Sequence, residues 1–78
     1  MVNREQAYTV FTFVSTHHAL KAELVLKQEG LKPMIIPVPR EVSSLCGLAI
    51  RVNQDLRLEV EEVLRERSVG IEEIINFG

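Results

Sequence analysis

The segment Pro33–Pro39, with the sequence PMIIPVP, constrains the fold because it combines strand-forming residues with three prolines. Ile35, Ile36 and Val38 favour an extended chain, whereas a proline cannot donate a hydrogen bond to a neighbouring strand. A strand of this kind is tolerated at the edge of a sheet, where one side is unpaired. We therefore expect residues 34–39 to form an edge strand.

The sequence before this segment predicts a strand followed by a helix. Residues 8–14 are rich in β-branched and aromatic side chains, which is typical of a central strand. Residues 19–29 consist mainly of strong helix formers, and either Ser15 or Thr16 can cap the start of this helix. Gly30 is a natural stop for the helix.

The sequence after the edge strand predicts a third strand, a second helix and a fourth strand. The third strand covers residues 48–52 and the fourth covers residues 71–77. The second helix is indicated by apolar residues at helical spacing, namely Leu56, Val60, Val63 and Leu64. The resulting β-α-β-β-α-β order is that of the ferredoxin-like α+β fold, with a four-stranded antiparallel sheet in the order 4-1-3-2 and two helices on one face. This order places the second strand at an edge, as the prolines require.

Length and charge limit the classes of function. The 78 residues predict one domain spanning residues 1–78, and 9 basic against 11 acidic residues give a net charge of −2. Such a chain lacks the basic surface typical of nucleic-acid binding, and its third strand lacks the aromatic residues on which RNA-recognition modules stack bases. No apolar run approaches the ~20 residues of a membrane span. The polar first residues do not resemble a signal peptide, so we expect a cytoplasmic protein.

Cys46 is the only cysteine, so the chain cannot form an intrachain disulfide. It lies on a polar loop between the second and third predicted strands. The first and second strands run parallel in the predicted fold, so this loop should lie at the same end of the sheet as Ser15, Thr16, His17 and His18, which open the first helix. The N-terminus of a helix favours negative charge, so a thiolate at Cys46 would be stabilised by the backbone N–H groups there.

Other residues of the same loop are candidates for the surroundings of a thiolate. Arg40 offers a fixed positive charge, Ser43 and Ser44 can donate hydrogen bonds, and Gly47 leaves room for an approaching group. Adjacent residues on a helix point about 100° apart, so at most one of the two histidines should face the cysteine, and His17 is slightly favoured.

Each of these residues also has an ordinary structural interpretation. A lone loop cysteine is more often structural or incidental than reactive, and neighbouring histidines are more often plain surface residues. Arg40 and Glu41 could form a solvated pair. A cysteine with one or two histidines could bind zinc or copper, but the sequence has no C-x-x-C motif and no third ligand at helical spacing, so no metal site is predicted.

Two segments of the chain resemble a known protein family. Residues 15–23, STHHALKAE, and residues 39–49, PREVSSLCGLA, resemble the small bacterial family described as putative Se/S carrier protein-like. The resemblance extends from about Tyr8 to the last strand. It implies a carrier in which Cys46 holds sulfur or selenium as a persulfide-like adduct, without any other cofactor, and passes it from a donor protein to an acceptor protein.

The residues leave two other functions open. The chain could be a small regulatory or interaction module in which Cys46 is incidental, or a thiol enzyme such as a peroxidase or reductase; a carrier is favoured over a catalyst. The apolar residues 74–77 of the last strand make its edge a candidate contact of a homodimer. A sulfur enclosed in the interior, or lying far from the histidines, would leave the carrier interpretation supported by the family resemblance alone.

Overall fold

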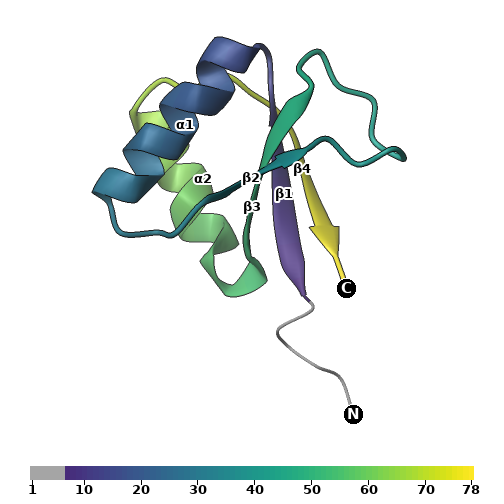
Figure 1. Cartoon of the computed structure of the whole chain (residues 1–78). Helices are drawn as coiled ribbons and strands as arrows, with labels where there is room; N and C mark the ends of the chain where they lie inside the picture. Colours follow the sequence, from purple (N-terminus) through teal and green to yellow (C-terminus); the bar gives the residue numbers. More distant parts are fainter. Residues whose placement is uncertain (1–6) are drawn as a thin grey trace.

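The structure, a computed structural model, describes residues 7–78 as a layer of strands packed against a layer of helices (Figure 1). Residues 1–6, whose polar character argued against a signal peptide, lie outside the described part of the chain. A short 3-10 turn, η2 (Gln54–Leu56), joins the third strand to the second helix. The main elements follow the predicted order as β1 (Tyr8–Phe13), α1 (Thr16–Gln28), β2 (Met34–Pro37), β3 (Leu48–Asn53), α2 (Arg57–Glu66) and β4 (Ile71–Phe77).

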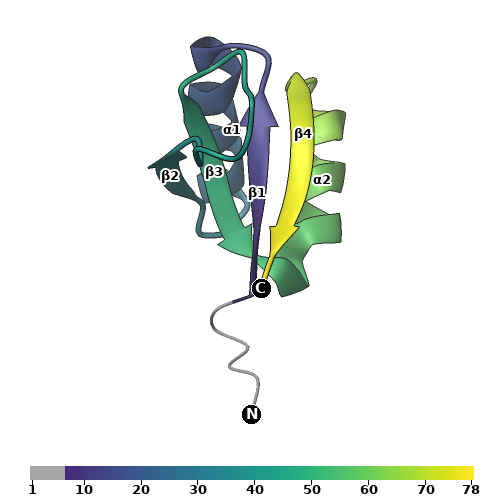
Figure 2. The ribbon, with the colours of Figure 1, turned by 90° about the vertical axis from the view of Figure 1, so that its right-hand side faces the viewer.

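The strands form an antiparallel sheet in the order β2-β3-β1-β4 (Figure 2). This is the predicted order read from the opposite edge, and the arrangement is compatible with the ferredoxin-like fold. β2 lies at one edge, as its prolines require, and Pro37 ends its pairing with β3 opposite Leu48. β4 forms the other edge. The pairing of two copies of the protein along β4 stays a prediction.

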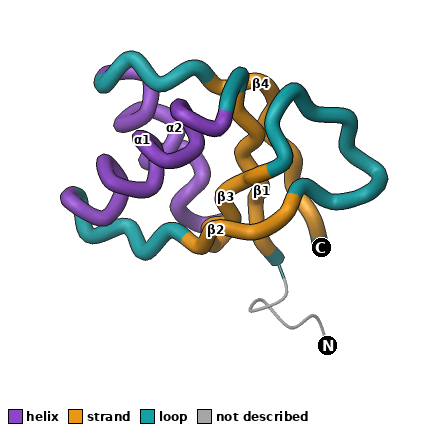
Figure 3. The backbone as a smooth tube through the Cα atoms, turned by 45° about the horizontal axis from the view of Figure 1, so that its top comes forward, coloured by secondary structure: helices purple, strands orange, loops and turns teal. Residues whose placement is uncertain are grey.

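The two helices cover one face of the sheet and enclose the hydrophobic core (Figure 3). The central strands contribute Phe11, Phe13 and Ile50 to this core, and the helices contribute Leu26 and Leu64; all five side chains are fully buried. Complete burial of such a side chain favours folding by ~1.5–3 kcal/mol. The core therefore fixes both helices against β1 and β3.

The helix α1 begins at Thr16, within the segment of residues 15–18 that was predicted to open it. The hydroxyl oxygen of Ser15 accepts a hydrogen bond from the backbone N–H of His18 at 3.3 Å, so Ser15 is the N-cap. Of the two predicted caps, Ser15 is therefore confirmed. His17 and His18 lie in the first turn of the helix.

The loop of residues 38–47, which joins β2 to β3, lies on the side of the sheet opposite the helices (Figures 1 and 2). Thr12 of β1 and Ala49 of β3 are paired with each other and alternate with the core residues Phe13 and Ile50, so they point away from the helices. Both are nevertheless fully buried. The loop therefore covers this part of the sheet before it returns to β3.

Candidate functional site

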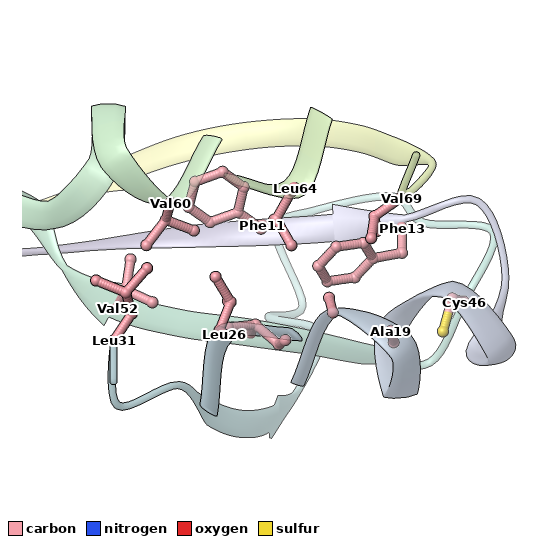
Figure 4. Packing of buried hydrophobic residues seen from close by; sticks show 12 residues of the cluster. Phe11, Phe13, Ala19, Leu26, Leu31, Cys46, Val52, Val60, Leu64 and Val69 are labelled. Atoms are coloured by element: carbon pink, nitrogen blue, oxygen red, sulfur yellow. The ribbon is translucent and has the colours of Figure 1, made fainter. Parts of the chain in front are cut away.

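Cys46 lies where the loop of residues 38–47 returns to the sheet, beside the start of α1 (Figure 4). Its Sγ atom is 3.5 Å from Thr16 Oγ1, in a hydrogen bond for which either atom could be the donor. The backbone N–H of Leu48 donates a second hydrogen bond to Sγ at 3.3 Å. The structure thus brings the cysteine loop and the helix start together, as the parallel course of β1 and β2 predicts.

Cys46 is buried. Only 3% of its surface is exposed, and it belongs to the same hydrophobic cluster as Phe13 and Ala19. A carrier needs a sulfur atom that a small donor can reach, so the access that this interpretation requires is not present in the structure. The enclosed position leaves the family likeness as the main support for a carrier.

The alternation of side chains along the strand explains this burial. Leu48, Ile50 and Val52 of β3 pack on the core, and Cys46 continues the same alternation two positions earlier. Leu45, one position out of phase, is 75% exposed. The pattern C-x-L-x-I-x-V is visible in the sequence, and it indicates an inward-facing sulfur. The polar residues of the surrounding loop obscure this signal in the sequence.

The helix start presents a hydroxyl group to Cys46, in place of the backbone N–H groups expected from the sequence. Among residues 7–78, no backbone N–H of the segment from Ser15 to His18 forms a hydrogen bond with Sγ. The N–H of His18 donates to Ser15 Oγ, because a capping side chain satisfies the free N–H groups of the first turn. The groups that face the sulfur are therefore the Leu48 N–H, which donates, and the Thr16 hydroxyl, which can donate or accept.

The two histidines have different surroundings. Nδ1 of His18 accepts a hydrogen bond from the backbone N–H of Gly70 at 2.8 Å, which ties α1 to the start of β4 and leaves the ring proton on Nε2. His17 is exposed, and its ring lies 5.8 Å from that of His18 in an edge-to-face arrangement. Within the described chain, neither imidazole forms a hydrogen bond with Cys46. At most one histidine was expected to face the cysteine, with His17 slightly favoured, and no contact of either ring with Cys46 singles one out.

A network of hydrogen bonds centred on Glu72 holds the loop segment that covers Cys46. The hydroxyl of Ser44 and the backbone N–H of Leu45 both donate to Glu72 Oε1, each at 3.0 Å. The backbone N–H of Cys46 in turn donates to Ser44 Oγ at 3.1 Å. The half-buried Glu72 on β4 therefore holds Ser44 and Leu45 directly, and it holds Cys46 indirectly through Ser44.

The position of Glu72 results from an irregularity in β4. Thr12 pairs with Glu73, whereas the next residue of β1, Phe13, pairs with Ile71. Glu72 is therefore the additional residue of a β-bulge, and a bulge redirects the side chain that it contains. The sequence offered no signal for this residue, since its contact with Leu45 spans 27 positions and depends on the bulge.

The remaining predicted site residues, Arg40, Ser43 and Gly47, are all exposed. In the part of the chain that the structure describes, neither Arg40 nor Ser43 forms a hydrogen bond or ion pair with Cys46. The carbonyl of Gly47 accepts a hydrogen bond from the backbone N–H of Val38 at 3.1 Å, which closes the base of the loop. A Cβ atom at Gly47 would meet nothing within 4 Å, so the space beside this glycine is open.

Residues 7–78 contain neither a cluster of metal-ligating side chains nor a helix that could span a membrane. In this range no group of three or more histidine, cysteine, aspartate or glutamate side chains is arranged to hold a metal ion. Residues 7–78 therefore offer no set of ligands for the zinc or copper site that was considered as an alternative. None of the helices in this range combines the length and the apolar content needed to cross a bilayer.

Comparison with known proteins identifies the family of this chain. No curated protein and no solved structure matches it. A model of the family described as putative Se/S carrier protein-like matches residues 8–76. This match covers nearly the whole chain, from β1 to β4, and the protein therefore belongs to the putative Se/S carrier protein-like family.

Proposed function

We propose that this protein carries sulfur or selenium on Cys46, as a persulfide or selenopersulfide, and passes it to a partner protein. The proposal rests on one observation beside the family membership: Cys46 is the only cysteine in the chain. A persulfide forms on a thiol. If the chain carries a chalcogen in this way, Cys46 is the residue that holds it.

Loading exchanges one sulfur–sulfur bond for another. The thiolate of Cys46 attacks the outer sulfur of a donor persulfide, a new S–S bond forms at Cys46, the donor's S–S bond breaks, and the donor leaves as a thiolate. Unloading repeats the exchange, with an acceptor thiolate as the nucleophile and Cys46 as the leaving group. Neither step consumes an oxidant. A selenopersulfide donor would transfer selenium by the same exchange.

The contacts of Cys46 suit an anionic sulfur. The Leu48 N–H donates to Sγ, and the Thr16 hydroxyl lies within hydrogen-bonding distance of it. Hydrogen bonds to a charged acceptor are stronger than those between neutral groups. Both donors can therefore stabilise the sulfur that attacks during loading and the sulfur that leaves during unloading.

Loading also requires that the loop over Cys46 opens, because the sulfur is enclosed in the structure. The segment from Ser44 to Cys46 is the part that must move, and its contact with β4 is the carboxylate of Glu72. Leu45 projects into solvent, so its side chain loses little packing when this segment moves, and the packing that is lost is that of Cys46. We infer that release of Glu72 from Ser44 and Leu45 precedes loading.

Intact-mass analysis after incubation with a small-molecule persulfide tests the proposal. The protein is expected to gain one sulfur atom, and Cys46→Ser, checked for native folding by circular dichroism, is expected to gain none. No adduct on the unsubstituted protein, or an equal adduct on Cys46→Ser, would overturn the proposal. Steady conversion of the persulfide without an adduct would point to a thiol enzyme.

The burial of Cys46 favours a second candidate function, an interaction module in which the cysteine is a core residue. In that case Cys46→Ser should lower the free energy of unfolding, and the native protein should resist thiol reagents up to its unfolding transition. A carrier instead reacts under native conditions, through local opening of the loop.

A further inference from the structure

A cavity of about 170 Å³ lies at the end of the sheet opposite Cys46. It forms where β1 and β2 begin and β3 ends, and its lining includes Tyr8, Lys32, Met34, Arg51 and Asn53. Cys46, by contrast, lies beside Thr16, just beyond the other end of β1. The cavity is therefore separate from the cysteine loop.

The residues that line this cavity are suited to an anion. They include two residues with basic side chains, Lys32 and Arg51, and Asn53, which has a side-chain amide; none of the described lining residues is acidic. The ion pairs of the described chain join other residues, Lys27 with Glu23 and Arg65 with Glu61. Among residues 7–78, therefore, two basic residues that form no ion pair line one cavity, on a protein whose net charge is −2.

Arg51 is held in place by aromatic rings. Its guanidinium carbon lies 3.8 Å from the centroid of the Tyr8 ring, and Tyr8 stacks on Phe77 with centroids 5.2 Å apart. A guanidinium group that lies over a ring keeps its N–H groups at the edge of the plane, where they can form paired hydrogen bonds with a carboxylate or phosphate. The aromatic stack therefore orients Arg51 without neutralising it.

Lys32 and Asn53 are also constrained. The backbone of Lys32 has φ of 50°, a left-handed conformation that is uncommon for residues other than glycine. Such conformations persist where the surrounding structure requires them, and they are more frequent at binding sites. The Oδ1 atom of Asn53 accepts the N–H of Asp55 at 3.0 Å, so its Nδ2 group remains as a donor.

We propose that this cavity binds a small anion through a carboxylate or phosphate group, independently of the chemistry at Cys46. Lys32 and Arg51 supply the charge, Asn53 supplies a further hydrogen bond, and Met34 and Tyr8 contact the apolar part of an organic ligand. Cavities for drug-sized ligands measure roughly 300–1,000 Å³. The ligand here is therefore a phosphate ion or an organic anion of a few carbon atoms.

Titration of the full-length protein with inorganic phosphate and with phenyl phosphate, followed by backbone amide chemical shifts at fixed ionic strength, tests this proposal. We expect saturable shifts at Tyr8, Arg51 and Asn53. Tighter binding of phenyl phosphate would identify an organic phosphate as the ligand, whereas equal binding would identify the free ion.

Two substitutions decide whether the cavity is the site. Lys32→Asn removes the charge while keeping a residue that tolerates a positive φ, and Arg51→Gln removes the guanidinium group. Each should weaken binding by about tenfold, since each removes a hydrogen bond to a charged group. Lys21→Gln, at a lysine of α1 outside the cavity, should bind as the unsubstituted protein does. Non-saturating shifts, or equal affinity in all variants, would overturn the proposal.

Discussion

Glu72 of β4 accepts a hydrogen bond at 3.0 Å from the backbone N–H of Leu45, the residue directly before the only cysteine. The same carboxylate oxygen accepts a hydrogen bond from the Ser44 hydroxyl, which in turn accepts the N–H of Cys46. A side chain on an edge strand therefore holds the loop segment that encloses the sulfur. Access to Cys46 should depend on Glu72, although Glu72 does not touch the sulfur.

Removal of the Glu72 carboxylate should speed the reaction of Cys46 with thiol reagents. A hydrogen bond to a charged group contributes about 1.5–3 kcal/mol, so Glu72→Ala should raise the rate of alkylation by iodoacetamide about tenfold or more. The matched control is Glu73→Ala, because Glu73 is the exposed neighbour on the same strand. Both variants need unfolding curves, to separate local opening from global unfolding. Equal rates in Glu72→Ala and Glu73→Ala would show that Glu72 does not control access.

Removal of the Thr16 hydroxyl should slow loading of Cys46 more than it affects folding. Thr16→Val keeps the shape of the side chain but takes away its contact with Sγ, whereas Thr16→Ser keeps the hydroxyl. The rate of persulfide loading, measured by intact mass, should fall by up to about tenfold in Thr16→Val. Thr16→Ser should load at nearly the original rate. Loading at the original rate in Thr16→Val would assign Thr16 a structural role only.

The two histidines should differ in their effect on stability. His18→Ala leaves the partly buried N–H of Gly70 without its acceptor, which should lower the free energy of unfolding by about 1 kcal/mol. His17 is exposed, so His17→Ala should change it by less than about 0.5 kcal/mol. Urea denaturation followed by circular dichroism measures both. Similar values for the two variants would contradict the role assigned to His18.

Persulfide loading of the same histidine variants distinguishes a carrier from a metal site. Neither imidazole forms a hydrogen bond with Cys46 within residues 7–78, so each variant should retain most of its loading. Loss of loading in His17→Ala and His18→Ala as complete as in Cys46→Ser would instead indicate that the three residues bind a common metal ion.

The addition of one methyl group should affect stability at one glycine and loading of Cys46 at another. A Cβ atom at Gly70 would lie 2.7 Å from Val14 Cγ2, so Gly70→Ala should cost about 1–3 kcal/mol of stability. A Cβ atom at Gly47 would meet nothing within 4 Å, so Gly47→Ala should leave stability nearly unchanged. Its loading rate should nevertheless fall if donors approach through the open space beside Gly47, which the methyl group would occupy. Thermal unfolding and intact-mass loading check the two effects, and unchanged loading in Gly47→Ala would show that donors approach elsewhere.

The arrangement of the sheet could be predicted from the sequence because local chemistry and topology agree. The prolines of β2 require an edge, and the strand order supplies one. That order also places the cysteine loop beside the start of α1, and the contact between Thr16 and Cys46 follows from it. These features depend on which helices and strands form and on their order along the chain. Both can be predicted from patterns of residues in the sequence.

The details of the site depend on contacts between distant residues, and most of these could not be predicted. The burial of Cys46 was indicated by its alternation with Leu48, Ile50 and Val52, and it was missed because the loop around it is polar. The hydrogen bonds of Glu72 with Ser44 and Leu45 depend on a β-bulge. The hydrogen bond from the Gly70 N–H to His18 joins residues 52 positions apart. Neither contact has a local pattern that marks it.

An isotopically labelled sulfur atom can show whether Cys46 takes up one chalcogen atom and transfers it to an acceptor. The protein is loaded from a labelled small-molecule persulfide, separated from excess donor, and mixed with an acceptor thiol, and the masses of both products are measured. We expect the label to leave the protein and to appear as a persulfide on the acceptor, and we expect Cys46→Ser to transfer none. Label that remains on the protein, or that reaches the acceptor equally from Cys46→Ser, would contradict it.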